Sequence, residues 1–148
     1  MVTQKSQYAL RALFELALRS AAGPTRIEDI AKAQAIPQRF LEVVLNELKH
    51  AGFVEARRGP RGGYLLARTP RDITVKDVIE CCQGRFTPVD CLGDAAADDC
   101  TFRGDCAFVS LWEEVRDVVN SVYGSTTLQD LVEREHARLS KTALNYSI

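Results

Sequence analysis

Three cysteines in the second half of the chain have the residue type and spacing of ligands to a metal centre. Cys91, Cys100 and Cys106 follow one another with eight and five residues between them, in a stretch without helix or strand periodicity. Thiolates are preferred ligands of iron-sulfur clusters, and three from one loop can hold several corners of a cluster. A structural zinc site normally has two cysteines about two to four residues apart, which this chain lacks. The spacing therefore favours a metal or cluster, with free or redox thiols as the alternative.

The remaining cysteines and both histidines are weaker candidates for chemistry. Cys81 and Cys82 end an expected apolar helix, where a free cysteine packs as a small hydrophobic residue. A redox role for this adjacent pair is the minor alternative. We expect His50 and His136 to be surface or capping residues on helices and not ligands.

Residues at the start of another expected helix have side chains that suit the edges of DNA bases. They are Gln38, Arg39, Glu42 and Val43. Arginine can bind guanine through two hydrogen bonds, glutamate can accept from cytosine N4, and valine can contact a thymine methyl group. In a helix-turn-helix the second helix of the motif places such residues in the major groove. Exposed charges on a helix are usually only solvated, so this interpretation depends on the surrounding elements.

A basic, glycine-rich turn follows that helix between two short expected strands, residues 53–57 and 64–67. It comprises Arg57, Arg58, Gly59, Pro60, Arg61, Gly62 and Gly63. The arginines can reach phosphates or a narrow minor groove, and the glycines let the backbone approach DNA closely. Alone, such a turn is more often a solvated hairpin. Its position after the helix pattern and its charge together favour DNA binding.

Three helices are expected before this turn. Apolar periodicity predicts the first over about residues 5–21, with Arg11, Glu15 and Arg19 forming one polar stripe. Thr25 and Glu28 match a capping box that would start the second helix. The third begins near residue 37 and ends before residue 52. Its expected buried face consists of Phe40, Leu41, Val44, Leu45 and Leu48.

Three further helices are expected over about residues 74–82, 108–123 and 128–139. The first and last each carry a capping pattern, Thr74 with Asp77 and Thr127 with Asp130. The middle helix has an apolar surface wide enough that part of it should meet a second subunit. We expect the last residues, 140–148, to be loose.

These elements predict a mainly α fold with a small β-hairpin: a winged helix-turn-helix plus a long dimerisation helix. Residues 1–71 would form the DNA-binding domain, and residues 72–148 the cysteine-loop, cluster-binding and dimerisation region. The charges divide at the same place. The 148 residues carry a net charge of -1, but the first 71 hold 12 Lys and Arg against 6 acids, and the rest hold 7 against 14. This asymmetry indicates an acidic partner for the first region.

Other classes of protein have less support. No stretch approaches the roughly 20 apolar residues that span a bilayer, and charges interrupt the apolar N-terminus that a signal peptide would need. We therefore expect a cytoplasmic protein that does not bind membranes, whose odd number of cysteines favours metal or redox chemistry over disulfides. No combination of nucleophile, base and orienting residue is visible, so we expect no enzyme activity.

The chain resembles the IscR/NsrR/RirA group of bacterial regulators, within the Rrf family. The resemblance covers roughly residues 1–135. It rests on residues 5–9 (KSQYA), residues 58–66 (RGPRGGYLL), the three-cysteine loop and residues 127–132 (TLQDLV). It implies a homodimeric winged-helix transcription factor with a long helix crossing to the partner.

The resemblance also implies roles for particular residues. Arg39, Phe40 and Glu42 would lie on the recognition helix, and residues 58–63 would form the wing. The three loop cysteines would hold a [4Fe-4S] or [2Fe-2S] cluster near the dimer interface. Its assembly, loss or reaction with nitric oxide or oxygen would change the affinity for operator DNA.

The chain departs from this pattern at the fourth cluster ligand. IscR-like members have a histidine three residues after the last cysteine, where this chain has Val109. NsrR-like members use an aspartate from the first helix of the other subunit, and the matching position is Gln7. A loop aspartate, Gln7 of the partner subunit, or an exogenous water or thiol could complete the site.

The sequence thus predicts a dimeric repressor that binds double-stranded operator DNA and whose affinity is controlled by an iron-sulfur cluster sensing iron, redox state or nitric oxide. One alternative is a regulator without a cluster that switches between thiols and disulfides. An electron-transfer protein is a further alternative, against which the basic N-terminal half argues.

Overall fold

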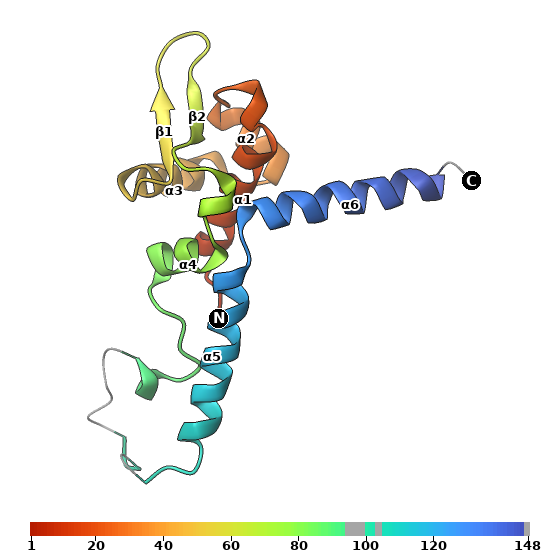
Figure 1. Ribbon diagram of the computed structural model, residues 1–148. Helices are drawn as coiled ribbons and strands as arrows, with labels where there is room; N and C mark the ends of the chain where they lie inside the picture. Colours follow the sequence, from red (N-terminus) through yellow and green to blue (C-terminus); the bar gives the residue numbers. More distant parts are fainter. Residues whose placement is uncertain (94–99, 103–104, 147–148) are drawn as a thin grey trace.

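The computed structural model describes residues 1–93, 100–102 and 105–146. A head at one end contains α1 (Gln4–Leu18), α2 (Ile27–Gln34), α3 (Gln38–His50), α4 (Val75–Gln83) and the hairpin of β1 (Val54–Arg57) and β2 (Gly63–Leu66). From this head α5 (Val109–Ser125) runs downward and α6 (Leu128–Tyr146) projects sideways, while the segment after α4 lies beside α5 (Figure 1). Short 3-10 turns occupy Ser20–Ala22, Pro70–Asp72 and Asp90–Leu92.

The helix α1 is the centre of the head, and it contacts α2, α3, α4 and α6. Its small residues Ala9 and Ala12 are fully buried beside Leu13, which lets the neighbouring helices approach closely. The helix ends at Leu18, earlier than its periodicity predicts, because the chain continues as a 3-10 turn.

One member of the expected polar stripe of α1 is buried. Glu15 is only 7% exposed, and its two carboxylate oxygens accept hydrogen bonds from Arg19 and from the amide of Gln34 on α2, at 2.8 and 2.9 Å. The predicted polar stripe is therefore not exposed along its whole length. Its burial is tolerated because both oxygens have partners.

The prediction that Thr25 and Glu28 form a capping box at the start of α2 was wrong. Arg26 is the N-cap, without a side-chain capping bond, and Thr25 pairs instead with Tyr64 of β2. The two backbone N–H···O bonds between Thr25 and Tyr64 are each 2.8 Å. This bridge attaches the hairpin to the segment that leads into α2.

The helices α2 and α3 with the hairpin form a winged helix-turn-helix. The turn between the helices contains Ala35 in the left-handed region (φ 51°) and the buried Ile36. The strands pair antiparallel with Val54 opposite Leu66 and Arg57 opposite Gly63. The expected fold class is therefore confirmed.

The two other capping boxes were predicted correctly. Thr74 and Asp77 exchange both capping bonds at 3.1 Å, and Thr127 and Asp130 do so at 3.1 and 2.9 Å. The last helix is longer than predicted, since α6 continues into the segment expected to be loose as far as Tyr146. Residues 147 and 148 of that segment lie outside the described residues.

The hydrophobic core of the head includes residues from beyond position 71. Ile73, Val78, Leu128 and Val132 are buried in the same cluster as the residues of α1 and α3. The helix α4 and the start of α6 thus pack as part of the head, whereas α5 buries none of its residues fully. The division of DNA reading and sensing near residue 71 concerns function and stays a prediction.

Candidate nucleic-acid interface and cysteine loop

The first turns of α3 present the predicted base-reading residues to solvent. Gln38, Arg39, Glu42 and Val43 are all exposed, while Leu41, Val44, Leu45 and Leu48 face the core. The prediction that Phe40 is buried was wrong, because its side chain is 62% exposed beside Val43, which is 57% exposed. The helix therefore carries an apolar patch next to its polar residues.

An ion pair fixes α3 against α1. Lys5 Nζ lies 2.7 Å from a carboxylate oxygen of Glu47, and the hydrogen bond to Glu47 raises the pKa of Lys5. Near the end of α3, His50 Nδ1 lies 2.7 Å from the carbonyl oxygen of Asn46, in keeping with the expected capping role. The ion pair thus joins α3 to α1, while the His50 contact lies within α3 itself.

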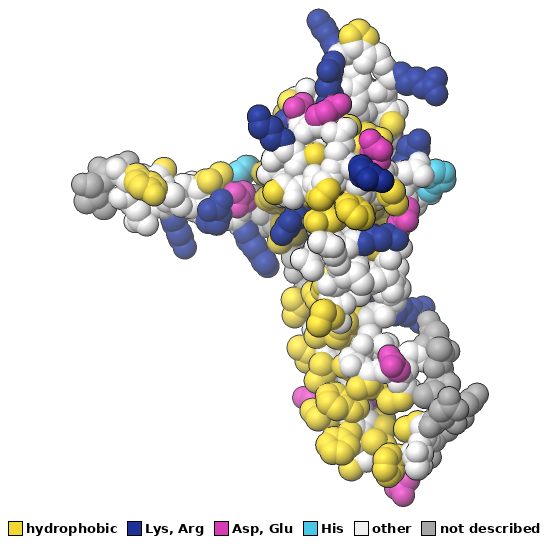
Figure 2. Space-filling view, turned by 180° about the vertical axis from the view of Figure 1, so that it is seen from behind, with side chains coloured by type: hydrophobic (Ala, Val, Ile, Leu, Met, Phe, Trp, Pro, Cys, Tyr) yellow, Lys and Arg dark blue, Asp and Glu magenta, His cyan; other side chains and the backbone are white. Residues whose placement is uncertain are grey.

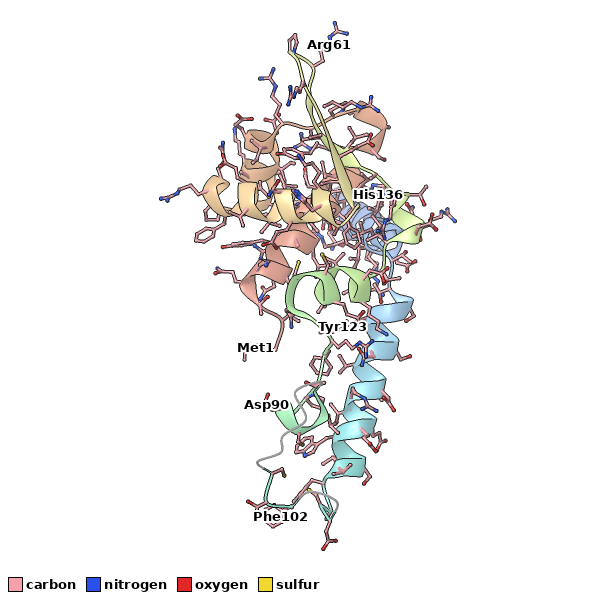
Figure 3. The ribbon with its side chains drawn as sticks, turned by 90° about the vertical axis from the view of Figure 1, so that its left-hand side faces the viewer. Met1, Arg61, Asp90, Phe102, Tyr123 and His136 are labelled. Carbon is pink, nitrogen blue, oxygen red and sulfur yellow. The ribbon has the colours of Figure 1, made fainter. Side chains whose placement is uncertain are left out.

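The hairpin turn holds its arginines away from the body of the head. Arg57, Arg58 and Arg61 are exposed, and Figure 3 shows Arg61 at the tip of the molecule. Figure 2 shows Lys and Arg side chains projecting around this end. The guanidinium of Arg26 donates a 2.8 Å hydrogen bond to the carbonyl of Pro60, which links the start of α2 to the turn. Sequence patterns give no signal for such a bond between residues 34 positions apart.

Two positions of the turn require glycine because neighbouring backbone atoms leave no room for a side chain. A Cβ on Gly62 would lie 2.2 Å from the carbonyl oxygen of Arg57, and one on Gly63 would lie 2.5 Å from that of Thr25. Gly63 also has φ of 150°, which other residues rarely adopt. Neither position can therefore accept a larger residue without moving the wing.

The predicted cluster cysteines lie on one loop, but the described part of the chain does not gather them into a metal site. Cys91 is exposed in the turn Asp90–Leu92, and Cys100 and Cys106 are half-buried. All three are free, and among residues 1–93, 100–102 and 105–146 no three His, Cys, Asp or Glu side chains are placed to hold a metal ion. The loop aspartates at 94, 98 and 99 lie outside the described residues.

The candidate fourth ligand is remote from the loop of its own chain. Gln7 is exposed on α1, where its amide donates a 3.2 Å hydrogen bond to the carbonyl of Val2. Figure 1 places α1 in the head and the turn Asp90–Leu92, which carries Cys91, beside α5 and outside the head. A role for Gln7 of the partner subunit as fourth ligand stays a prediction.

The cysteine pair at the end of α4 differs from expectation at one position. Cys82 is half-buried beside the core, and burial raises the pKa of its thiol to about 11. Cys81 is exposed instead of packed, because α4 turns its side chain toward solvent between α1 and α3. The prediction of two core cysteines was thus wrong for Cys81.

The helix α5 leaves an apolar face uncovered. Phe108, Leu111, Val118 and Val122 are each between 46% and 60% exposed. Figure 2 shows hydrophobic side chains gathered over the lower part of the molecule, which contains α5. Within the described residues, none of the helices has both the length and the apolar character needed to span a bilayer.

Comparison with known proteins agrees with this architecture. Residues 2–134 match the model of the Rrf2 family, described as iron-dependent transcriptional regulators. A putative rrf2-like regulator of Rhodobacter capsulatus is 37% identical over 138 residues, covering 89% of this chain and 92% of that protein.

Two solved structures have the same fold. That of CymR, described as the global cysteine regulator of B. subtilis, aligns with a TM-score of 0.76 at 34% identity and covers 90% of this chain and 97% of that one. The structure of IscR from T. potens aligns with a TM-score of 0.72 at 32% identity. The alignment covers 91% of this chain and 88% of that one. The chain therefore belongs to the Rrf2 family of transcriptional regulators.

Proposed function

We propose that this transcriptional regulator is a homodimeric repressor whose affinity for operator DNA is set by an iron-sulfur cluster on Cys91, Cys100 and Cys106. The observation that carries the proposal is the combination, in one chain, of an exposed arginine-bearing winged helix and three free thiols on a single loop. The description of the family as iron-dependent supports iron as part of the signal.

The DNA-binding part of the proposal rests on exposure and charge. The exposed residues at the start of α3 suit base edges, and the wing arginines suit phosphates. Two such heads on a two-fold axis require a nearly palindromic operator. Its half-sites would lie about 34 Å, one helical turn, or a multiple of this apart.

The dimeric part rests on the apolar face of α5. Large hydrophobic side chains in a continuous row on an exposed helix are typical of a surface that a partner covers. A second copy of α5 would bury this row by packing against it. The two heads would then sit on either side of the pair of helices.

The cluster part rests on the donor chemistry. Three thiols that are free of disulfides match the ligands that iron-sulfur clusters prefer. The carbonyl of Cys106 accepts a 3.3 Å hydrogen bond from Val109 at the start of α5, so this cysteine is tied to the helix. When bound, a [4Fe-4S] or [2Fe-2S] cluster would supply a redox-sensitive centre, with Gln7 of the partner subunit as a candidate fourth ligand.

A thiol switch without a cluster is the second candidate. It is favoured by the similarity to a protein described as a global cysteine regulator and by the exposed position of Cys91. Oxidation would then join two of the loop cysteines and change the affinity for DNA without iron.

Anaerobic reconstitution with iron and sulfide, followed by visible spectroscopy and operator binding, tests these candidates. We expect a coloured protein that bleaches in air or nitric oxide, with at least a tenfold difference in DNA affinity, about 1.4 kcal/mol, between the two forms. Cys91→Ser should abolish the colour, whereas the matched Cys81→Ser should retain it. A colourless protein with oxidant-dependent disulfides would contradict the cluster and support the thiol switch.

A further inference from the structure

A polar cavity lies between α4, the segment 84–93 and α5. Its volume is about 600 Å³, and its wall includes Lys76, Arg85 and Arg116. Glu80 is the only carboxylate that lines it among the described residues. The cavity therefore carries three positive charges against one negative charge, although this half of the chain is acidic overall.

Two of the three cations have an ion-pair partner, and all three keep nitrogen donors for further bonds. No hydrogen bond or ion pair joins Arg85 to another residue that the structure describes. Arg116 bonds its neighbour Asp117 through Nε at 3.0 Å, a contact that occupies neither of its terminal nitrogens. Lys76 lies 3.9 Å from Glu80, at the outer limit of an ion pair. Donors on three different segments thus remain available to a ligand in the cavity.

Neutral groups in the wall can complete such a site. The hydroxyl of Thr87 and the amide of Asn120 also line the cavity. The ring of Phe86 packs edge-on against Tyr123 at a centroid distance of 6.4 Å, which holds the segment that carries Arg85 and Thr87 against α5. The arrangement can therefore offer both charged and neutral donors from a fixed wall.

The position of the cavity separates it from the DNA-reading surface. Figure 3 shows Tyr123 and Asp90 in the lower part of the molecule and Arg61 at the opposite tip. A phosphate of operator DNA bound to the wing would be far from the cavity. Leu92, next to Cys91, lines the cavity, so a ligand there would touch both α4 of the head and the start of the cysteine loop.

We propose that this cavity binds a small metabolite through a phosphate or carboxylate group. Arginine side chains bind both groups through paired hydrogen bonds, and several cations around one concavity favour an anion more than isolated surface charges do. A bound anion would join α4 to α5 and so provide a second input to the regulator. This input does not depend on the cluster.

Equilibrium dialysis of the full-length protein with radiolabelled inorganic phosphate and, separately, citrate tests the site. At constant ionic strength we expect one saturable site per chain with a dissociation constant below about 1 mM for at least one of the two anions. The stronger of the two identifies a phosphate or a carboxylate as the natural ligand group. Binding should persist when Cys91, Cys100 and Cys106 are replaced by serine, which separates the site from the cluster proposal.

Substitutions of the two cavity arginines test whether the anion binds in this cavity. Arg85→Gln and Arg116→Gln should each weaken binding at least tenfold while circular dichroism shows a folded protein. The control Arg134→Gln removes one charge from an exposed position of α6, outside both the wing and the cavity, and should leave binding unchanged. Absence of saturable binding for both anions, or an equal loss in Arg134→Gln, would overturn the proposal.

Discussion

Ser6 and Gln83 join the start of α1 to the end of α4 through a 2.7 Å hydrogen bond from the Ser6 hydroxyl to the side-chain carbonyl of Gln83. The same carbonyl accepts from the backbone N–H of Thr3 at 2.9 Å, and the Gln83 amide donates to the carbonyl of Met1 at 3.1 Å. Ser6 is fully buried. One glutamine therefore holds the N-terminus of the chain against the helix that leads into the cysteine loop.

Removal of this glutamine should destabilise the head. We expect Gln83→Ala to lower the free energy of unfolding by about 1–3 kcal/mol, because the buried Ser6 hydroxyl loses its acceptor. Urea denaturation measures the change. The control is Gln129→Ala, since Gln129 bonds Glu133 on the surface of α6 at 3.3 Å and its loss should cost less than about 0.5 kcal/mol. Equal losses in the two variants would contradict the role of Gln83.

The two substitutions Gly63→Ala and Gly124→Ala should have opposite effects. A Cβ at Gly63 would meet the backbone of Thr25, so this change should destabilise the protein by more than about 2 kcal/mol and weaken DNA binding. A Cβ at Gly124, within α5, would lie an ordinary 3.6 Å from Lys76 Cδ. Alanine there should stabilise by about 0.5–1 kcal/mol, because it reduces the freedom of the unfolded chain. Thermal unfolding compares the two, and a tolerated Gly63→Ala would contradict the close contact with Thr25.

Local patterns were the most predictable part of this fold. Thr74 and Thr127 lie opposite each other in a β-bridge, but the backbone bonds of that bridge are made by the flanking residues. The N–H of each threonine therefore stays free to donate to its capping aspartate. The same pattern failed at Thr25, whose backbone N–H and C=O are both bonded to Tyr64, 39 positions away in the hairpin. Competition from a distant strand cannot be read from a four-residue spacing.

The candidate DNA-binding residues could be predicted from local patterns, but the cavity could not. Helix periodicity placed Arg39 and Glu42 on the exposed face of α3, but it could not show that Phe40 has no core residue to cover it. The cavity between α4 and α5 was missed because Lys76, Arg85 and Arg116 are far apart in the sequence and follow no motif. Only the packing of α5 beside the segment 84–93 brings these cations together.

Arg39 and Arg58 should contribute differently to DNA binding. Arg39→Ala, on the exposed face of α3, should cost about 1–3 kcal/mol on the operator and relax base preference at one position. Arg58→Ala, on the wing, should weaken binding to all sequences and reduce the slope of log K against log salt by about one. Fluorescence anisotropy over a salt series with operator and scrambled DNA distinguishes them. The same effect of both variants on every DNA would rule out this division.

The apolar row on α5 should hold the dimer together. Val118→Glu places a charge among Leu111 and Val122, so burial of this face would require desolvation of the carboxylate. Sedimentation equilibrium should then give the chain mass of 16.4 kDa, in contrast to twice this mass for the unchanged protein. Ala33→Glu, at an exposed position of α2, is the control and should remain dimeric. A Val118→Glu protein that stays dimeric would place the interface elsewhere.

The adjacent thiols of α4 should react at different rates. Burial raises the pKa of Cys82 to about 11, so about one thiol in a thousand is ionised at pH 8, and only the thiolate reacts with iodoacetamide. Cys81 is exposed and open to the reagent. Mass spectrometry of the tryptic peptide 77–85 from Cys81→Ser and Cys82→Ser proteins measures each thiol separately. We expect Cys81 to be labelled at least tenfold faster than Cys82 in the folded protein, and the difference to vanish in concentrated urea. Equal rates in the folded state would show that the packing of α4 against α1 does not protect Cys82.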